Sequence, residues 1–321
     1  MEINDIQMIS GRIRDNVMKV IIGKAEIIDY IITAIIAGGH VLLEDTPGTG
    51  KTMLAKSIAR SIDGVFNRIQ FTPDLLPSDI TGLNIYNQNL HEFEFVPGPV
   101  FTNILLADEI NRATPRTQSS LLECMEEKQV TIDGKTRLLD QPFLVIATQN
   151  PIETAGTYTL PEAQLDRFVM QLSMGFPSNN EELAIMDRFI VNNPIDTLAP
   201  VCTKEQITEM GKRCKLVYVD NSVRQYIVNL VSATRNHASI SSGVSTRGTL
   251  ALLKTVQIYA AINGRDFVTP EDIKRLAVPV LSHRIVSYTN VAKNNNKPAI
   301  IKSILESIPT PTENFGGQQM F

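Results

Sequence analysis

The sequence lacks several features that would assign it to a well-marked class of protein. It has no tryptophan, three cysteines and four histidines in 321 residues. Cys124, Cys202 and Cys214 are odd in number and far apart, which argues against a disulfide framework and against a zinc site. The histidines are equally scattered and show no metal-binding spacing. We therefore expect a protein of the reducing cytoplasm, with no metal held by cysteine or histidine.

Long apolar segments and a strong basic excess are also missing. The apolar run at residues 27–37 is interrupted by Asp29, Tyr30 and Thr33, so it is too short and too polar to cross a bilayer. No secretory signal pattern is present. The net charge is -4, from 30 basic and 34 acidic residues, whereas general nucleic-acid binding needs a basic face. We therefore expect neither membrane insertion nor a nucleic-acid partner.

Residues 1–176 instead alternate short apolar runs with helical patterns. The runs predict strands at 41–43, 65–69, 104–107, 143–147 and 168–172, and the stretches 51–62 and 117–127 between them predict helices. This rhythm is typical of a parallel sheet flanked by helices, the α/β class. Apolar residues at consecutive positions indicate strands that are buried on both faces.

Two segments interrupt this rhythm and predict inserted hairpins. Residues 83–96 alternate around a polar centre, and residues 129–139 alternate around Asp133-Gly134, a strong turn signal.

A second, helical region follows the α/β region. Prolines and asparagines concentrate at 177–200, which predicts a linker around a short helix at 181–190. Residues 201–308 read as helical, and Thr269-Pro270-Glu271-Asp272 is a good helix start because a capping hydroxyl precedes proline and acids. The tail, 309–321, is rich in Pro, Thr, Gly and Gln, and we expect it to be poorly ordered.

The first predicted strand leads into a phosphate-binding loop of the Walker A type. Gly48 and Gly50 let the backbone turn its N–H groups toward phosphate, and the helix that follows points its amino terminus at the same anion. Lys51 supplies a cation to the β and γ phosphates, and Thr52 offers a hydroxyl to Mg²⁺. Asp45 stands where the general pattern has glycine, which we interpret as variation; the alternative is a glycine-containing turn that only resembles the motif. The expected ATP-binding set here is Thr46, Pro47, Gly48, Thr49, Gly50, Lys51, Thr52 and Met53.

The third predicted strand ends in two acids, Asp108 and Glu109, as in a Walker B motif. Mg²⁺ prefers few carboxylates and several waters, so Asp108 together with Thr52 is the predicted metal site. Glu109 is the predicted base for the attacking water. A strand that ends at a solvated acidic turn is the alternative, which the upstream phosphate loop disfavours.

At this point the motifs resemble a known family. The phosphate loop and the segments 108–113, 147–151, 162–168, 243–247 and 269–273 are together similar to the MoxR family of AAA+ ATPases, over nearly the whole chain. The resemblance implies a P-loop AAA+ fold: a parallel five-stranded sheet in the order 5-1-4-3-2, flanking helices, inserted hairpins and a small all-helical lid. It also implies ATP and Mg²⁺ as cofactors.

The resemblance assigns further residues. Asn150 matches the sensor 1 residue, Arg167 the arginine finger that reaches a neighbouring subunit's γ-phosphate, and Arg247 the sensor 2 arginine of the lid. Ile22 and Gly23 match the segment that contacts adenine. The expected catalytic set is Lys51, Glu109, Asn150, Arg167 and Arg247. Arg112 and Arg116 are rival candidates for the arginine that acts on the neighbouring subunit.

A finger that acts on a neighbour implies a homo-oligomeric ring, expected to be a hexamer. Family membership also implies a chaperone-like role in remodelling, assembly or cofactor insertion, with a protein client and a partner that carries a von Willebrand factor A domain. Two other functions stay open: a nucleic-acid-acting AAA+ protein of helicase or loader type, and a nucleotide-switched scaffold that hardly hydrolyses ATP. In the hairpin regions, 71–74 and 93–95 are candidate contact segments, although packing within the hairpins is the favoured interpretation.

Overall fold

A five-stranded parallel sheet forms the centre of the computed structural model, which describes residues 1–150, 157–191, 193–288 and 297–311. Its strands are β1 (Val41–Glu44), β2 (Phe66–Gln70), β5 (Ile104–Asp108), β8 (Leu144–Gln149) and β9 (Met170–Leu172). Every neighbouring pair is parallel, in the order β2-β5-β8-β1-β9. Numbered by their place among these five strands, they follow the order 5-1-4-3-2, which confirms the predicted fold.

Successive side chains of the central strands enter two separate apolar cores. Leu106 and Ile146 face a core built with α1 (Ile3–Met18), α2 (Ala25–Ile36) and α3 (Lys51–Ser61). Leu105 and Val145 face the second core, which α4 (Pro77–Thr81) and α5 (Pro115–Glu127) cover. This alternation explains the runs of consecutive apolar residues. The prediction of two buried faces is wrong for β2, an edge strand in which only Ile69 is buried.

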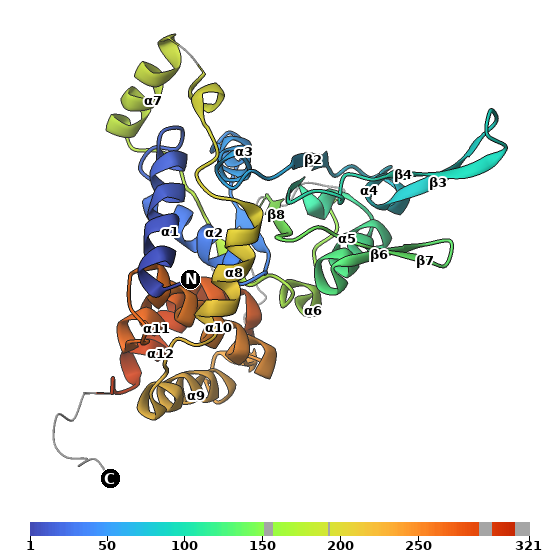
Figure 1. Ribbon diagram of the computed structural model, residues 1–321. Coiled ribbons are helices and arrows are strands. Elements are labelled where there is room, and N and C mark those ends of the chain that lie inside the picture. Colours follow the sequence, from blue (N-terminus) through green and yellow to red (C-terminus); the bar gives the residue numbers. More distant parts are fainter. Residues whose placement is uncertain (151–156, 192, 289–296, 312–321) are drawn as a thin grey trace.

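The two predicted hairpins are present. They consist of β3 (Gly82–Asn87) with β4 (Glu92–Pro97), and of β6 (Gln129–Ile132) with β7 (Lys135–Leu138). Asp133 and Gly134 both have positive φ, 49° and 74°, as a tight two-residue hairpin turn requires. Both hairpins project from the same side of the molecule (Figure 1), and Asn84 of one donates a hydrogen bond to Asp133 of the other.

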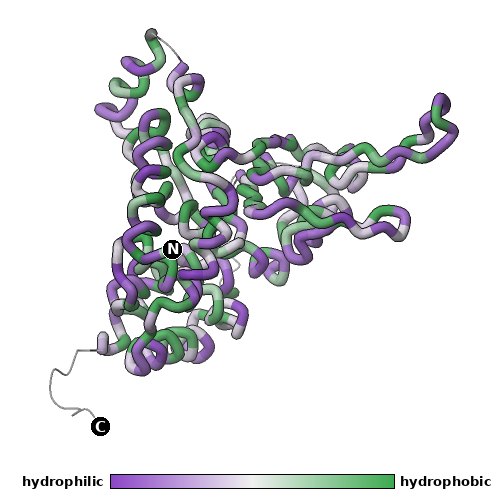
Figure 2. Tube along the Cα trace, in the orientation of Figure 1, coloured by the Kyte–Doolittle hydropathy of each residue, from purple (hydrophilic) through white to green (hydrophobic). Residues whose placement is uncertain are grey.

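The aromatic residues of the candidate contact segments have different environments. Phe71 is fully buried in the second core, so it is not available to a partner. Phe95 lies edge-on to Phe101 and beneath the guanidinium of Arg137. Phe93 is 72% exposed, on a hairpin where hydrophobic and hydrophilic residues alternate (Figure 2). Phe93 also packs within its hairpin, edge-on to Tyr86 of the facing strand, although most of its surface stays exposed.

A helical lid follows the sheet. The connection contains α6 (Glu162–Leu165), α7 (Asn179–Val191) and the short 3-10 helix η2 (Pro194–Thr197), and another 3-10 helix, η1 (Ile110–Arg112), follows β5. The lid contains α8 (Lys204–Cys214), α9 (Asn221–Arg235), α10 (Thr246–Ile262), α11 (Pro270–Leu281), η3 (Ser282–Arg284) and α12 (Lys297–Ser307), with a small pair of strands, β10 (Ile240–Ser242) and β11 (Val286–Ser287). As predicted, Thr269 caps α11, through reciprocal bonds with Asp272.

The amino-terminal helices join the lid to the sheet. Residues of α1 and α2 share one apolar core with α8, α9, α10 and α11. The domain boundary predicted at 177–200 marks a change in composition along the chain. It does not separate two apolar cores, because the first core contains residues from both sides of it. In the described part of the chain, no helix is both long enough and apolar enough to span a membrane. The tail that is predicted to be poorly ordered spans residues 309–321, and its residues from 312 onward lie outside the described part of the chain.

Candidate active site

The loop between β1 and α3 has the backbone geometry of a phosphate cradle. Gly48 and Gly50 have φ values of 87° and 88°, a region that side chains with a Cβ rarely adopt. Gly50 caps α3, so the free N–H groups of the first turn point out of the helix beside the loop. The ammonium of Lys51 donates to the carbonyl oxygens of Asp45 (2.9 Å) and Thr46 (3.2 Å), which keeps it at the loop.

Asp45, the departure from the glycine pattern, fixes the loop to the end of β9. Its side chain is buried and accepts from the hydroxyl of Ser173 (2.8 Å) and from the backbone N–H groups of Met174 (2.8 Å) and Gly175 (3.0 Å). These partners lie 128 to 130 positions away in the sequence, so the carboxylate of Asp45 bonds to a distant segment rather than within its own turn. Asp45 is not among the residues with positive φ, so the position does not require glycine.

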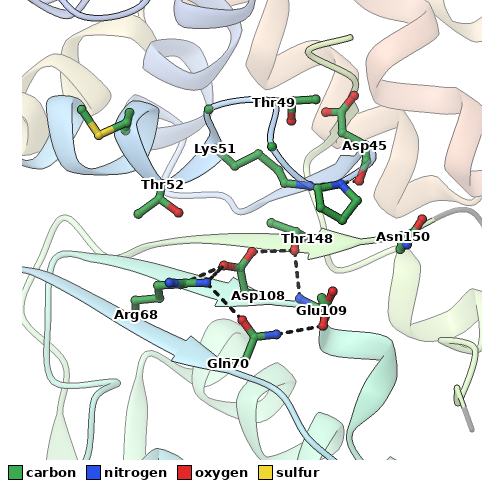
Figure 3. Close-up of a pocket in the computed structure, with 14 residues that line it drawn as sticks. Asp45, Thr49, Lys51, Thr52, Arg68, Gln70, Asp108, Glu109, Thr148 and Asn150 are labelled. Carbon is green, nitrogen blue, oxygen red and sulfur yellow. Dashed lines mark hydrogen bonds and ion pairs between the residues drawn. The ribbon is translucent and has the colours of Figure 1, made fainter. Parts of the chain in front are cut away.

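The two acids at the end of β5 are held differently. Asp108 accepts from the hydroxyl of Thr148 (2.9 Å) and pairs with Arg68 (2.7 Å). Glu109 has a left-handed backbone, φ 55°, which is uncommon for a residue other than glycine. Its N–H donates to the Thr148 hydroxyl (2.9 Å), so one threonine connects both acids to β8 (Figure 3).

The carboxylate of Glu109 is oriented by a polar pair from β2. The amide of Gln70 donates to it (2.9 Å), and Arg68 in turn donates to the Gln70 oxygen (3.1 Å). Arg112 pairs with the same carboxylate oxygen (3.2 Å). Glu109 is thus fixed by hydrogen bonds and charge in a position that faces the phosphate loop (Figure 3).

These groups surround one cavity of about 220 Å³. Of the predicted set it is lined by Pro47, Gly48, Thr49, Gly50, Lys51, Thr52, Met53, Asp108, Glu109 and Asn150. Four further lining residues were not singled out for the site's chemistry by the sequence: Asp45, Arg68, Gln70 and Thr148. Only Gln70 and Thr148 carried a signal in the sequence, because they are polar residues near the carboxyl ends of predicted strands, where parallel strands meet at one edge of a sheet. Thr46 contributes its carbonyl to Lys51.

Two predicted arginines are brought together elsewhere. Among the described residues that line the cavity, neither Arg167 nor Arg247 appears. Both pair instead with Glu126 near the end of α5, Arg167 at 3.2 Å and Arg247 in close contact. Of the rivals, Arg112 is engaged with Glu109 and Arg116 lies exposed in the first turn of α5.

The segment predicted to contact adenine also lies outside the described lining of the cavity. Gly23 has a φ of 73°, and a Cβ built on it would collide with the carboxylate of Glu181 at the start of α7. Ile22 is half-buried beside it. The roles of Ile22, Gly23, Arg167 and Arg247 therefore stay predictions.

The donor set at the cavity fits magnesium bound together with phosphate. Thr52 and Asp108 contribute one hydroxyl and one carboxylate to the same cavity. No cluster of three or more acidic, cysteine or histidine side chains suited to a metal occurs among the residues that the structure describes. Mg²⁺ in nucleotide sites uses one or two carboxylates, water and substrate phosphates, and so needs no such cluster.

Comparison with known proteins agrees with this geometry. Residues 40–170 match the model of the ATPase family associated with various cellular activities (AAA), and residues 232–304 match the AAA lid domain. Chaperone MoxR1 of Mycobacterium tuberculosis is 39% identical over 94% of this chain and 82% of its own length. The chain belongs to the MoxR family of AAA+ ATPases.

Two further similarities support the assignment. Protein MoxR of Paracoccus denitrificans is 31% identical, over 91% of this chain and 93% of its own. A crystal structure of a presumed ATPase from Cytophaga hutchinsonii superposes with a TM-score of 0.89 at 40% identity, and 97% of each chain is covered. In this MoxR-family chain, the cavity between the phosphate loop and the acid pair lies within residues 40–170, the part that matches the AAA ATPase model.

Proposed function

We propose that this MoxR-family protein hydrolyses ATP in a reaction that depends on Mg²⁺. The observation that carries the proposal is one cavity in which Lys51 and Thr52 face Asp108 and Glu109 (Figure 3). The loop and the amino end of α3 bind the phosphates through N–H groups, and Lys51 balances their charge. Magnesium, held by Thr52 and Asp108, would neutralise charge that develops on the phosphates.

Glu109 is the proposed base in this reaction. Gln70 and Arg112 orient its carboxylate toward the loop, and a carboxylate so placed positions a water molecule and takes its proton. Asn150, which also lines the cavity, is the proposed second polar contact for that water. No group here needs a covalent step, because phosphoryl transfer to water depends on position and charge.

The working form is proposed to be a homo-oligomeric ring, with six subunits as the expected number. Arg167 pairs with Glu126 and lies outside the described lining of its own chain's cavity, which supports a role at a neighbour's cavity. An arginine supplied by another subunit can raise phosphoryl transfer by about 10³ to 10⁵. Glu126 holds both guanidinium groups in the single chain, and assembly would exchange it for phosphate.

The cellular role that fits best is chaperone-like remodelling or assembly of protein complexes in the cytoplasm. The relative named Chaperone MoxR1 supports this, as do the three buried free cysteines, which suit a reducing compartment. A protein client and a partner with a von Willebrand factor A domain remain part of the proposal. The exposed hairpin β3–β4 is the proposed client contact, since it offers Ile85, Tyr86 and Phe93 to solvent.

The direct test compares wild type with Glu109→Gln in nucleotide binding and in phosphate release. The amide keeps the size of the side chain but cannot accept the proton, so ATP should bind as in wild type while turnover falls by about 10² or more. Lys51→Ala is the matched control, because it should lose binding as well. Normal turnover in Glu109→Gln would remove Glu109 as the base.

A further inference from the structure

A second cavity, of about 230 Å³, lies where the lid meets the sheet domain, and it is similar in size to the ATP cavity. We call it the basic pocket. Every charged side chain among its described lining residues is a lysine: Lys128, Lys212, Lys215 and Lys254. Lys128 follows α5, Lys212 and Lys215 belong to the end of α8, and Lys254 lies on α10. The carboxyl end of α2 and other residues of α8, which lies beside it, contribute to the wall (Figure 1), together with Gln141 and Pro142.

The positive charge of this pocket is not balanced within the described chain. The protein has an excess of acidic residues, yet across the described ranges none of the four ammonium groups forms an ion pair with a carboxylate. Within the described lining, the opposing features are the carboxyl ends of three helices, α2, α5 and α8, and each helix end carries only about half an elementary charge. Most of the charge of four lysines therefore remains without a counterion from the described fold.

Burial and neighbouring positive charges also disfavour the charged form of two of these lysines. A Cβ on Gly38 would lie 3.0 Å from the ammonium of Lys128, so the glycine leaves room for that group. Burial lowers the pKa of Lys128. Burial also lowers the pKa of Lys254, and the charges of Lys128 and Lys215 lower it more. An anion among these groups would remove the repulsion between them.

We propose that the basic pocket binds a polyanion made of at least two linked phosphate groups. A single phosphoryl group carries about -1.5 to -2 charges at neutral pH, and two linked groups, which share a bridging oxygen, together carry about -3, so they offset most of the charge of four lysines. A single carboxylate would balance only one. Ammonium groups are also suitable phosphate ligands because each can donate several hydrogen bonds.

Such a ligand would connect the sheet domain of this protein to its lid. In many two-domain enzymes, two such domains move relative to each other. One lysine comes from the sheet domain and three come from the lid, so a bound polyanion connects the two. Lys128 also follows Glu126 by two positions, and Glu126 holds Arg167 and Arg247. The inference goes beyond ATP hydrolysis and does not depend on it.

The test uses pyrophosphate as the probe, on the full chain with Lys51→Ala to remove binding at the ATP site. Pyrophosphate is titrated into the protein in a calorimeter, and a titration with sodium chloride of equal ionic strength serves as the blank. We expect one pyrophosphate per chain, and Lys128→Met with Lys254→Met should weaken it by roughly tenfold or more, since charged hydrogen bonds are lost. Methionine keeps the apolar stem. The control pair, Lys135→Met with Lys302→Met, removes the same charge from exposed positions outside the pocket and should bind as before.

Three results would overturn the proposal: no binding of pyrophosphate, equal weakening by the control pair, or equal binding of a hexaglutamate peptide, which would indicate an acidic protein segment instead. A second pair, Lys212→Met with Lys215→Met, lies on the exposed side of α8 and guards against misfolding of the first. It should weaken pyrophosphate in the same way. Unchanged affinity in both pocket pairs would also contradict the proposed site.

Discussion

At the scale of single residues, Asp45 and Gln70 show how a nucleotide site can be stabilised by side chains outside its motifs. Asp45 uses its whole carboxylate on the segment after β9, so the phosphate loop is attached at its first residue. Gln70 stands at the end of an edge strand and donates to Glu109, the proposed base, which follows the neighbouring strand β5. Both act by orientation, since neither is a base or a phosphate ligand in the proposed reaction.

Replacement of Asp45 should therefore lower stability. Asp45→Ala leaves the buried N–H of Met174 and that of Gly175 without their acceptor, which should cost on the order of 2–4 kcal/mol of unfolding free energy. Ser173→Ala is the matched control, because it removes one of the three bonds and should cost about 1 kcal/mol. Urea unfolding of the two variants measures the difference. Equal midpoints would show that the carboxylate does not anchor the loop.

The sequence predicted some of these residues and not others for a physical reason. Lys51, Thr52, Asp108 and Glu109 belong to short motifs, in which each role depends on neighbours in the chain. Arg68, Gln70 and Thr148 act across strands, so their role follows only when β2, β5 and β8 are placed side by side. Glu126 is a similar case, because nothing local connects it to Arg167 or Arg247.

At the scale of elements, runs of consecutive apolar residues were sufficient to predict the sheet strands, and alternation around polar turns was sufficient to predict both hairpins. Predicted and observed bounds differ by one or two residues, as with the hairpin predicted at 83–96 and found at 82–97. The helix start before Thr117 was missed because Pro115 at the first position was not used as a signal. Packing of α1 and α2 against the lid could not be read from sequence, since it depends on distant contacts.

The hairpin β3–β4 should be dispensable for folding. Between Leu83 and Val96 its residues are mostly exposed, and neither core draws a buried side chain from these two strands. A chain in which residues 84–95 are replaced by Asn-Gly should keep its melting temperature within a few degrees and keep basal ATP turnover. Thermal unfolding and phosphate release check this. Loss of cooperative unfolding would show that the hairpin belongs to the folding unit.

At the scale of the whole molecule, two buried histidines should make stability depend on pH. His40 accepts from the N–H of Val145 and donates to the Met125 carbonyl, and burial lowers its pKa from 6.5 to about 4. His283 donates to the carbonyl of Phe168, and burial lowers its pKa to about 3. The unfolded chain takes up protons that the folded chain refuses, so stability is lost as pH falls from 6.5 toward 4.

Each histidine should contribute a loss of roughly 1 kcal/mol between about pH 7.5 and pH 5.5. The measurement is urea unfolding at both pH values for wild type and for His40→Gln. The variant has one fewer group that titrates, so its change with pH should be smaller by that amount. The same change in both proteins would show that His40 does not contribute.

The central claim, an ATPase completed by a neighbouring subunit, is tested most directly by mixing two inactive variants. Arg167→Ala should bind ATP yet lose turnover by on the order of 10³-fold, while Lys51→Ala cannot bind ATP but still offers Arg167. In an equal mixture, turnover should return, because mixed interfaces pair an intact cavity with an intact arginine. Turnover no higher than the sum of the separate variants would contradict the claim, and recovery with Arg112→Ala or Arg116→Ala instead would move the role to that arginine.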